Sequence, residues 1–150
     1  MSAAPRISLD SGTSILVDTS AYFALVADEG HRHQAAIAIQ EQLGRRGARL
    51  VTTSLILAET HALLLARLNR TDLAAELFER IYESRGTRVF RPTEADERQA
   101  LAPIKRYTDK RFFFTDAVSF IVMEQLGITH AFTFDRNFAQ YRFITLPPLL

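Results

Sequence analysis

Short apolar runs alternate along this chain with longer segments in which apolar residues recur every three or four positions. Runs such as "SILVD" at 14–18 are typical of buried strands, and segments such as "HRHQAAIAIQEQLGRRG" at 31–47 are typical of helices with one buried face. This alternation favours an α/β fold in which a mostly parallel sheet is flanked by helices on both faces. The pattern predicts strands at 14–18, 48–53, 87–91, 128–135 and 142–147, and helices at 20–27, 31–47, 55–69, 71–86, 94–107 and 114–127.

Residues that commonly begin, end or bend helices support several of these boundaries. We expect Thr53 or Ser54 to cap the helix at 55–69, Thr71 to cap the helix that follows, Gly86 to end that helix, and Pro103 to bend the one at 94–107.

The length and composition indicate one soluble globular domain, because 47% of the 150 residues are hydrophobic and 23% are charged. We predict a disordered N-terminal extension at 1–13 and a single domain at 14–150. The chain has no cysteine, which excludes a disulfide frame, a thiolate nucleophile and a zinc–thiolate site. No apolar run approaches the length that spans a membrane, so we expect a cytoplasmic protein.

Four acidic residues occupy positions where a charge needs an explanation. Asp18 and Asp135 each follow an apolar strand directly, Glu59 shares the apolar stripe of the helix at 55–69, and Asp116 lies at the start of a helix. Parallel sheets place their sites at the carboxyl ends of the strands. The four carboxylates are therefore expected to converge on one crevice.

Each acid also has an ordinary explanation. Asp18 and Asp116 can be helix N-caps, Asp135 can begin a turn, and Glu59 can hydrogen bond to a neighbouring helix. These alternatives explain each position separately but do not explain why all four fit one crevice.

A cluster of carboxylates is stabilised by protons or by cations, because the charges repel one another. Mg²⁺ and Mn²⁺ are the hard cations that prefer oxygen ligands of this kind. Such an ion activates water and neutralises charge on a phosphoryl oxygen, so the cluster favours phosphodiester hydrolysis. Local basic stretches, "GRRGAR", "DKRFFF" and "FDRNF", permit a nucleic-acid substrate although the net charge is only +1; the alternative is that they are solvated loop charges.

Four stretches, in the order "VDTSAYFALV", "LAETHALL", "FTDAVSFIVM" and "AFTFDRNF", resemble the motifs of the PIN-domain family. The resemblance is to its bacterial branch, the VapC-type toxins of toxin–antitoxin modules, and it covers nearly the whole chain after the first dozen residues. It implies a PIN fold and an Mg²⁺-dependent endoribonuclease whose metal ligands fall on Asp18, Glu59, Asp116 and Asp135. Asp18 and Asp116 are the expected direct ligands, with Glu59 and Asp135 either ligating the metal or holding its water molecules.

The same resemblance implies supporting hydroxyl groups at Ser20 and Thr115, which are expected to orient the carboxylates. Lys110, Arg111 and Arg136 lie next to Asp116 or Asp135 in the chain, and we expect them to bind RNA phosphates.

The resemblance further implies a cognate antitoxin as protein partner. The apolar segments "SAYFALVA" and "ALLLARL" belong either to the core or to a subunit interface, and together with the resemblance they predict a homodimer.

Two other functions stay open at this point. Receiver domains of signalling proteins are also doubly wound and bind Mg²⁺, but they carry paired acids after the first strand and a late lysine, whereas Asp18 stands alone and "AFTFD" ends in an aspartate. A PIN-fold module that binds a partner without activity is the second alternative, and the presence of all four acids argues against it.

Overall fold

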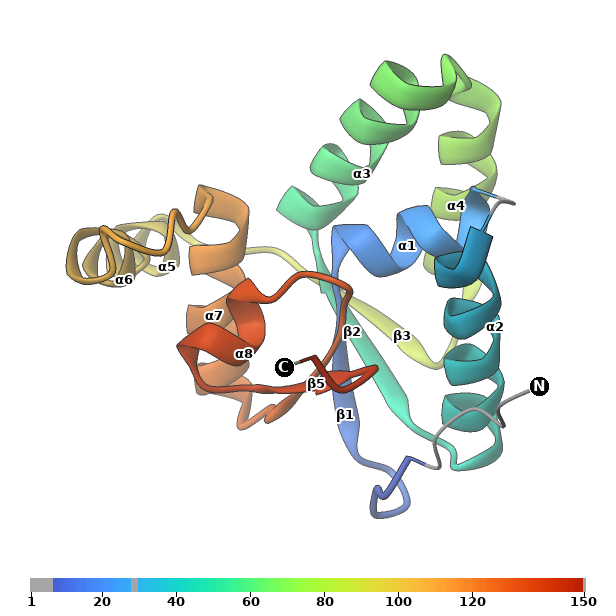
Figure 1. Cartoon of the computed structure of the whole chain (residues 1–150), viewed down its shortest axis with the longest axis horizontal. Helices are drawn as coiled ribbons and strands as arrows, with labels where there is room; N and C mark the ends of the chain where they lie inside the picture. The colour runs from blue at the N-terminus through green and yellow to red at the C-terminus, as the bar shows by residue number, and fades with distance from the viewer. Residues whose placement is uncertain (1–6, 28–29, 150) are drawn as a thin grey trace.

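A five-stranded parallel sheet forms the centre of the protein in the computed structural model, which describes residues 7–27 and 30–149 (Figure 1). The strand order is β3-β2-β1-β4-β5, and every neighbouring pair is parallel. The predicted α/β fold with a parallel sheet is confirmed. The strands are β1 (Ser14–Val17), β2 (Arg49–Thr53), β3 (Thr87–Phe90), β4 (His130–Phe132) and β5 (Ile144–Leu146).

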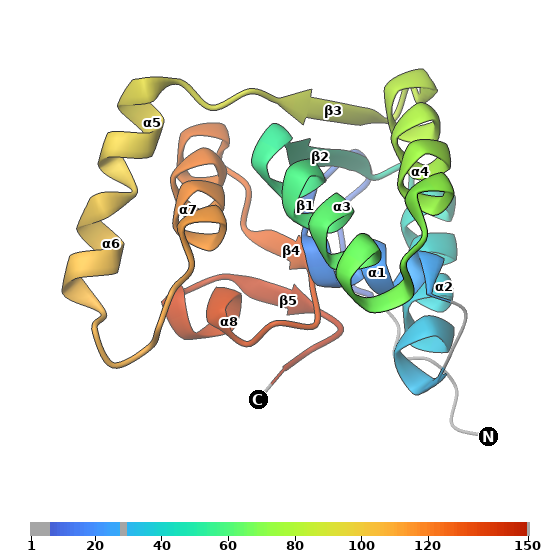
Figure 2. The ribbon, with the colours of Figure 1, turned by 90° about the horizontal axis from the view of Figure 1, so that it is seen from above.

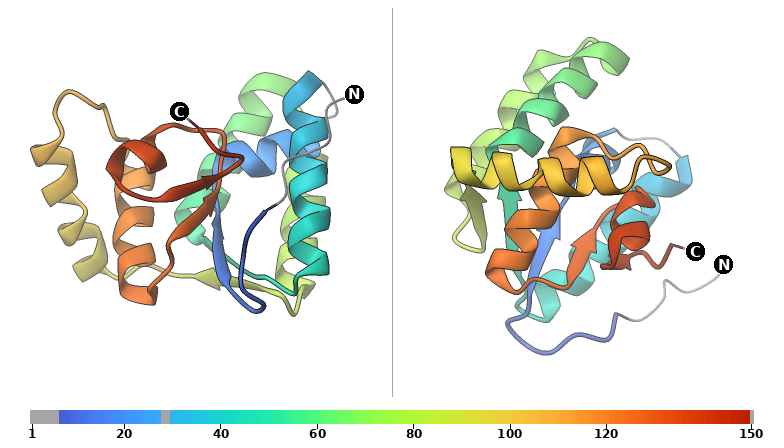
Figure 3. Two further views of the ribbon diagram at one scale, coloured as in Figure 1. Left: turned by 60° about the horizontal axis from the view of Figure 1, so that its bottom comes forward. Right: turned by 90° about the vertical axis from the view of Figure 1, so that its left-hand side faces the viewer.

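Helices cover both faces of this sheet, as Figure 2 shows, with α5 to α8 on one side and α1, α2 and α4 on the other. Figure 3 shows α5 and α6 crossing the outer side of α7, with which both are in contact. The helices are α1 (Thr19–Val26), α2 (Gly30–Arg45), α3 (Ser54–Leu68), α4 (Thr71–Glu83), α5 (Glu94–Gln99), α6 (Leu101–Arg106), α7 (Phe114–Leu126) and α8 (Asn137–Tyr141).

The direction of the strand order changes at β1, because β2 and β3 lie to one side of it and β4 and β5 to the other. In open α/β sheets a crevice for ligands forms outside the carboxyl ends of the strands at such a point. Ile15, Leu16 and Val17 of β1 are buried in the core, and Asp18 follows them at once. The topology therefore brings the end of β1 and the end of β4 together.

The start of the chain differs in part from the predicted disordered extension. Residues 1–6 lie outside the described residues. From residue 7 onward the chain packs on the domain: Ile7 is buried, and its backbone N–H donates to Oε1 of Gln42 at 3.0 Å. The apolar side chain of Ile7 joins the core cluster, so residues 7–13 are part of the packed structure.

The helix predicted at 94–107 is two short helices, and the break lies at Ala100 rather than at Pro103. Pro103 lies in the first turn of α6, where the missing proline N–H needs no partner. A proline ring in a continuous helix would clash with the carbonyl group four residues earlier, which is that of Gln99, and α5 ends at Gln99.

Two further boundary predictions were wrong and one was confirmed. Thr53 is the N-cap of α3, and its side chain accepts the N–H of Ile56 at 3.1 Å. Arg70, not Thr71, is the N-cap of α4, and this helix ends at Glu83 with Ser84 as C-cap, so Gly86 lies beyond its end.

Helix α8 was not predicted. Residues 137–141 lie between the last two predicted strands, where a turn was expected, and the strand predicted at 142–147 is confined to Ile144–Leu146. A helix of five residues is too short to show a helical period in the sequence. It still contributes to the core through the fully buried side chain of Phe138.

Among the described residues, no helix combines the length and the apolar character needed to cross a membrane.

Candidate active site

Asp18 is held in the core at the carboxyl end of β1, with only 2% of its surface exposed. Its Oδ2 accepts hydrogen bonds from Oγ of Ser20 at 3.1 Å and from Oγ1 of Thr133 at 2.9 Å. Its Oδ1 is buried and has no hydrogen-bond partner among the described residues. Although Asp18 occupies the N-cap position of α1, its carboxylate makes no capping hydrogen bond. Capping therefore does not explain this acid.

Two hydroxyl groups tie the end of β4 to the start of α1. Oγ of Ser20 and Oγ1 of Thr133 lie 3.1 Å apart, and the N–H of Phe134 donates to Ser20 Oγ at 2.9 Å. The N–H of Asp135 donates to Thr133 Oγ1 at 3.0 Å. Ser20 thus lies where its predicted supporting role requires. Thr133 was missed by the sequence analysis, although a hydroxyl residue between a strand end and an acid, in "TFD", is a signal that could have identified it.

Asp116 reaches the same region from the first turn of α7 and is 3% exposed. The N-cap of α7 is Phe113, so Asp116 is the third residue of the helix and the alternative of an N-cap is wrong. Its Oδ2 accepts a hydrogen bond from Nδ2 of Asn137 at 2.9 Å. The backbone N–H of Asn137 donates to Oδ1 of Asp135, also at 2.9 Å.

Asn137 therefore links two of the predicted acids, and the sequence analysis missed it. Asp135 does begin a turn, as its ordinary explanation held, since it accepts the N–H two residues later. The turn and the site coincide, because the same turn carries the amide that contacts Asp116.

Burial and mutual repulsion raise the pKa of both buried acids. Burial is the larger cause for Asp18, whose pKa rises to about 6; the hydrogen bond from Thr133 opposes this, and the charges of Asp135 and Glu59 add to it. The pKa of Asp116 rises to about 8, chiefly through burial and then through the charge of Asp18, with smaller contributions from Asp135 and Glu59. The charges of Glu59 and Asp135 thus act on both buried acids.

Glu59 differs from the two buried aspartates. It is half-buried on α3 and makes no hydrogen bond or ion pair among the residues that the structure describes. Its carboxylate interacts with the other acids through charge alone. The alternative explanation, a hydrogen bond to a neighbouring helix, is not what the structure shows.

The remaining predicted residues make no hydrogen bond or ion pair with these carboxylates in the part of the chain that the structure describes. Thr115 is half-buried, and its side chain makes no hydrogen bond among the described residues. Its backbone carbonyl oxygen accepts a hydrogen bond from Oγ of Ser119 at 2.8 Å. Lys110 forms an ion pair with Asp109 at 3.6 Å. Arg111, with a φ of 50°, and Arg136 are exposed. The supporting role of Thr115 and the phosphate-binding roles of the three basic residues stay predictions.

The oxygen donors present fit a divalent cation such as Mg²⁺. Within 7–27 and 30–149, no three His, Cys, Asp or Glu side chains lie close enough together to form a ready-made metal-binding group. Mg²⁺ does not require one, since it keeps several water molecules and binds through one or two carboxylates. Oδ1 of Asp18 is buried without a partner among the described residues, and the carboxyl group of Asp116 has a raised pKa. A cation would be bound by these oxygen atoms.

Thr133→Val tests the support that Asp18 receives. We expect the free energy of unfolding in EDTA at pH 7 to fall by about 1–3 kcal/mol, because the buried carboxylate of Asp18 loses a hydrogen-bond donor. The stabilisation by Mg²⁺ should shift to about 10–100-fold higher Mg²⁺ concentration. Urea unfolding across a Mg²⁺ series measures both effects. Thr145→Val, at a buried hydroxyl that accepts from Leu149 outside the site, is the control. An unchanged Mg²⁺ response in Thr133→Val would contradict the assignment.

Comparison with known proteins agrees with this arrangement. The model of the PIN domain family matches residues 15–144. The chain is 31% identical over 134 residues to the 23S rRNA-specific endonuclease VapC20 of Mycobacterium tuberculosis. The aligned region covers 89% of this chain and 98% of that protein.

Solved structures show the same likeness. The crystal structure of VapC20 from Mycobacterium tuberculosis, described as a Sarcin-Ricin loop cleaving toxin, has a TM-score of 0.75 at 32% identity and covers 87% of this chain and 96% of that one. FitAcB from Neisseria gonorrhoeae has a TM-score of 0.61 at 19% identity, covering 88% of this chain and 96% of that one. PAE2754 from Pyrobaculum aerophilum has a TM-score of 0.53 at 24% identity, with 90% of each chain covered.

FitAcB and PAE2754 are less than 25% identical to this chain, so their similarity concerns the fold alone. The family match and the VapC20 relative go further, and they argue against a receiver-like signalling domain. With motifs, fold and comparisons in agreement, this chain belongs to the PIN-domain family, in its VapC-type branch.

Proposed function

We propose that this chain is an Mg²⁺-dependent endoribonuclease that acts in the cytoplasm as the toxin of a toxin–antitoxin module. The single observation that carries the proposal is the pair of buried carboxylates, Asp18 and Asp116, at the point where the strand order reverses. Burial raises the pKa of both, which means that their charged forms are disfavoured in the folded protein. A bound cation would stabilise these charged forms. The relative VapC20 is an endonuclease, which supports the same reaction here.

The proposed ligands are those predicted from the sequence. Asp18 and Asp116 would bind the metal directly, and Glu59 and Asp135 would either bind it or hold its water molecules. Mn²⁺ would satisfy the same oxygen donors. When bound, the ion supplies charge neutralisation at a phosphodiester and a lowered pKa for water.

The residues of the chain perform the positioning. Ser20 and Thr133 fix the orientation of Asp18 by donating to its Oδ2, and Asn137 fixes Asp116 relative to Asp135. Thr115 is proposed as a further supporting hydroxyl.

Basic side chains beside the acids would hold the substrate. Lys110, Arg111 and Arg136 are proposed to bind RNA phosphates. Arg136 directly follows Asp135 and is exposed, and its guanidinium makes no hydrogen bond or ion pair within residues 7–27 and 30–149, so it is available to a phosphate group.

The substrate to test first is 23S rRNA, because VapC20 is specific for it. Purified protein should cut RNA with Mg²⁺ and lose this activity in EDTA, and Mn²⁺ should restore it. A panel of 23S rRNA, 16S rRNA and tRNA, with cleavage sites mapped by primer extension, measures both activity and preference. Cleavage that persists in EDTA, or its absence for every RNA with either metal, would contradict the proposed function.

Two protein partners belong to the proposal. A cognate antitoxin would inhibit by placing a basic side chain at the carboxylates, since an arginine fork matches paired carboxylates. A second copy of the chain would form a homodimer. Light scattering of the chain alone and with the product of a neighbouring gene measures both; a monomer throughout, with no complex, would contradict them.

A further inference from the structure

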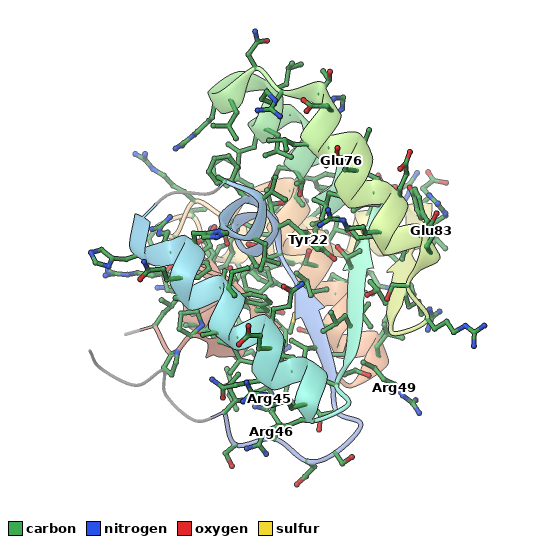
Figure 4. All side chains as sticks on the ribbon, turned by 90° about the vertical axis from the view of Figure 1, so that its right-hand side faces the viewer. Tyr22, Arg45, Arg46, Arg49, Glu76 and Glu83 are labelled. Carbon is green, nitrogen blue, oxygen red and sulfur yellow. The ribbon has the colours of Figure 1, made fainter. Side chains whose placement is uncertain are left out.

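One basic stretch of the sequence takes no part in the site described above. The segment "GRRGAR" contributes Arg45, Arg46 and Arg49, which lie at the end of α2 and the start of β2 (Figure 4). This edge of the sheet is where the parallel strands begin. The carboxylates lie at the edge where the strands end, so the two groups are on opposite edges of the sheet.

The fold brings two more arginines to this edge. Strand β3 runs parallel to β2 with Leu50 opposite Thr87 and Val51 opposite Arg88, so Arg85 and Arg88 lie at the start of β3. Side chains two residues apart in a strand point to the same face, which places Arg49 and Arg88 on the same face of the sheet. An open hollow of about 330 Å³ has three of these arginines in its wall, together with Ser14 and Gly86: Arg49, Arg85 and Arg88.

The five arginines are exposed and only weakly neutralised. Arg45 pairs with Glu41 at 3.7 Å, and Arg46 donates to the carbonyl oxygen of Leu9 at 3.3 Å. Arg88 lies over the ring of Phe90, with 5.4 Å from its Cζ to the ring centre. Arg49, Arg85 and Arg88 make no ion pair within the described ranges.

Acidic side chains on the elements around this edge are few. They are Asp10 in the turn before β1, Glu41 on α2, Glu79 and Glu83 near the end of α4, and Glu124 in the last turn of α7, which pairs with Arg142. None of the large exposed hydrophobic side chains of the described residues lines the hollow. Protein interfaces are usually anchored by such side chains, whereas a nucleic-acid backbone is bound by arginines that each contact a phosphate.

We infer that this arginine edge, formed by Arg45, Arg46, Arg49, Arg85 and Arg88, is a second RNA-binding surface that holds the phosphate backbone of a folded RNA. This deepens the proposed function and rests on it for its biological meaning. Arg49 and Thr53 are four residues apart in β2, which is about 13 Å along the strand. A substrate bound at both edges must therefore extend beyond the bond that is cut by more than this distance, which a folded RNA does and a single strand of only two or three nucleotides does not.

The test is the triple variant Arg49→Gln, Arg85→Gln, Arg88→Gln. Its matched control removes three other exposed arginines, with Arg67→Gln, Arg98→Gln and Arg106→Gln. Fluorescence anisotropy in EDTA measures binding of a folded 23S rRNA fragment and of a short single-stranded RNA across a salt series. Cleavage of the short RNA in Mg²⁺ and thermal melts are measured alongside.

We expect the edge variant to bind the folded fragment at least tenfold more weakly, while the control binds like wild type. The slope of log affinity against log salt concentration should fall by about 2–3, because about 0.9 of the slope comes from each duplex phosphate contact. Binding and cleavage of the short RNA and the melting temperature should not change.

Equal losses in the edge variant and the control would overturn the inference, as would unchanged binding of the folded fragment. Displacement of the fragment by inorganic phosphate at matched phosphate concentration would show a pocket for a single small anion and would also overturn it. The proposed function can fail separately. If the chain cuts no RNA but the edge variant still binds the folded RNA more weakly than wild type, the inference stands and the nuclease activity is refuted.

Discussion

Asp116→Asn is expected to lower Mg²⁺-dependent RNA cleavage by more than about 100-fold, since loss of a ligand removes several kcal/mol of transition-state stabilisation. The metal-free protein should unfold at the same temperature or higher, because asparagine neither buries a charge nor has to take up a proton on folding, whereas Asp116 must do one or the other. An asparagine oxygen can still accept the hydrogen bond from Asn137 Nδ2. Wild type should gain stability with the logarithm of Mg²⁺ concentration, and the variant should gain less.

Asp96 supplies a matched control, because it is also a buried aspartate at the third position of a helix. Its carboxylate accepts the N–H of Thr93 at 2.8 Å and a side-chain hydrogen bond from Gln125, and these bonds lower its pKa. Asp96→Asn should therefore destabilise the protein and leave cleavage and the Mg²⁺ response unchanged. Thermal melts in EDTA and across a Mg²⁺ series, with RNA cleavage, compare the two. An active Asp116→Asn enzyme with a full Mg²⁺ shift would refute the metal site.

The metal-free protein should lose stability as the pH rises from 6.5 to 8. In this range Asp116, with a pKa of about 8, keeps its proton in the folded state, whereas the unfolded chain, with a pKa of 3.8, has lost it. The folded state then binds more protons, so the free energy of unfolding falls with pH, by up to about 1.4 kcal/mol per pH unit for one group. Below this range Asp18, with a pKa of about 6, adds to the fall. His130, whose pKa is lowered by burial, opposes this fall, and its effect fades above pH 6.5 as the unfolded chain also loses that proton.

Urea unfolding in EDTA between pH 6.5 and 8 measures this slope. Asp116→Asn should flatten it, and saturating Mg²⁺ should flatten the wild-type slope, because a cation favours the charged carboxylate. Asp96→Asn should leave it as in wild type, since the lowered pKa of Asp96 titrates below this range. If the slopes of wild type and Asp116→Asn were equal, the raised pKa would have to belong to another group.

The sequence was sufficient to predict the parallel sheet and its flanking helices. The convergence of the four acids on one metal stays a prediction. Asp18 and Asp135 could be identified because an acidic residue directly after an apolar strand is seldom buried unless it is paired or has a functional role. Glu59 was found from the helical period of its apolar neighbours. These signals are local in the sequence, and a parallel sheet places the carboxyl ends of its strands on the same side.

Thr133 and Asn137 could not be identified in the same way. A threonine and an asparagine near a turn have ordinary local roles, and only the fold shows that one donates to Asp18 and the other to Asp116. The break at Ala100 was missed because the effect of Pro103 falls one turn before it. The arginine edge needed the pairing of β2 with β3, which no single stretch of sequence contains.

The hydrogen bond from Thr133 to Asp18 joins residues that are 115 positions apart. A contact of this kind forms late, because the chain between the two residues must first be made and folded. During translation, Asp18 leaves the ribosome long before Thr133 and Asn137 do. The nascent chain therefore lacks an assembled site until almost all of it has been synthesised.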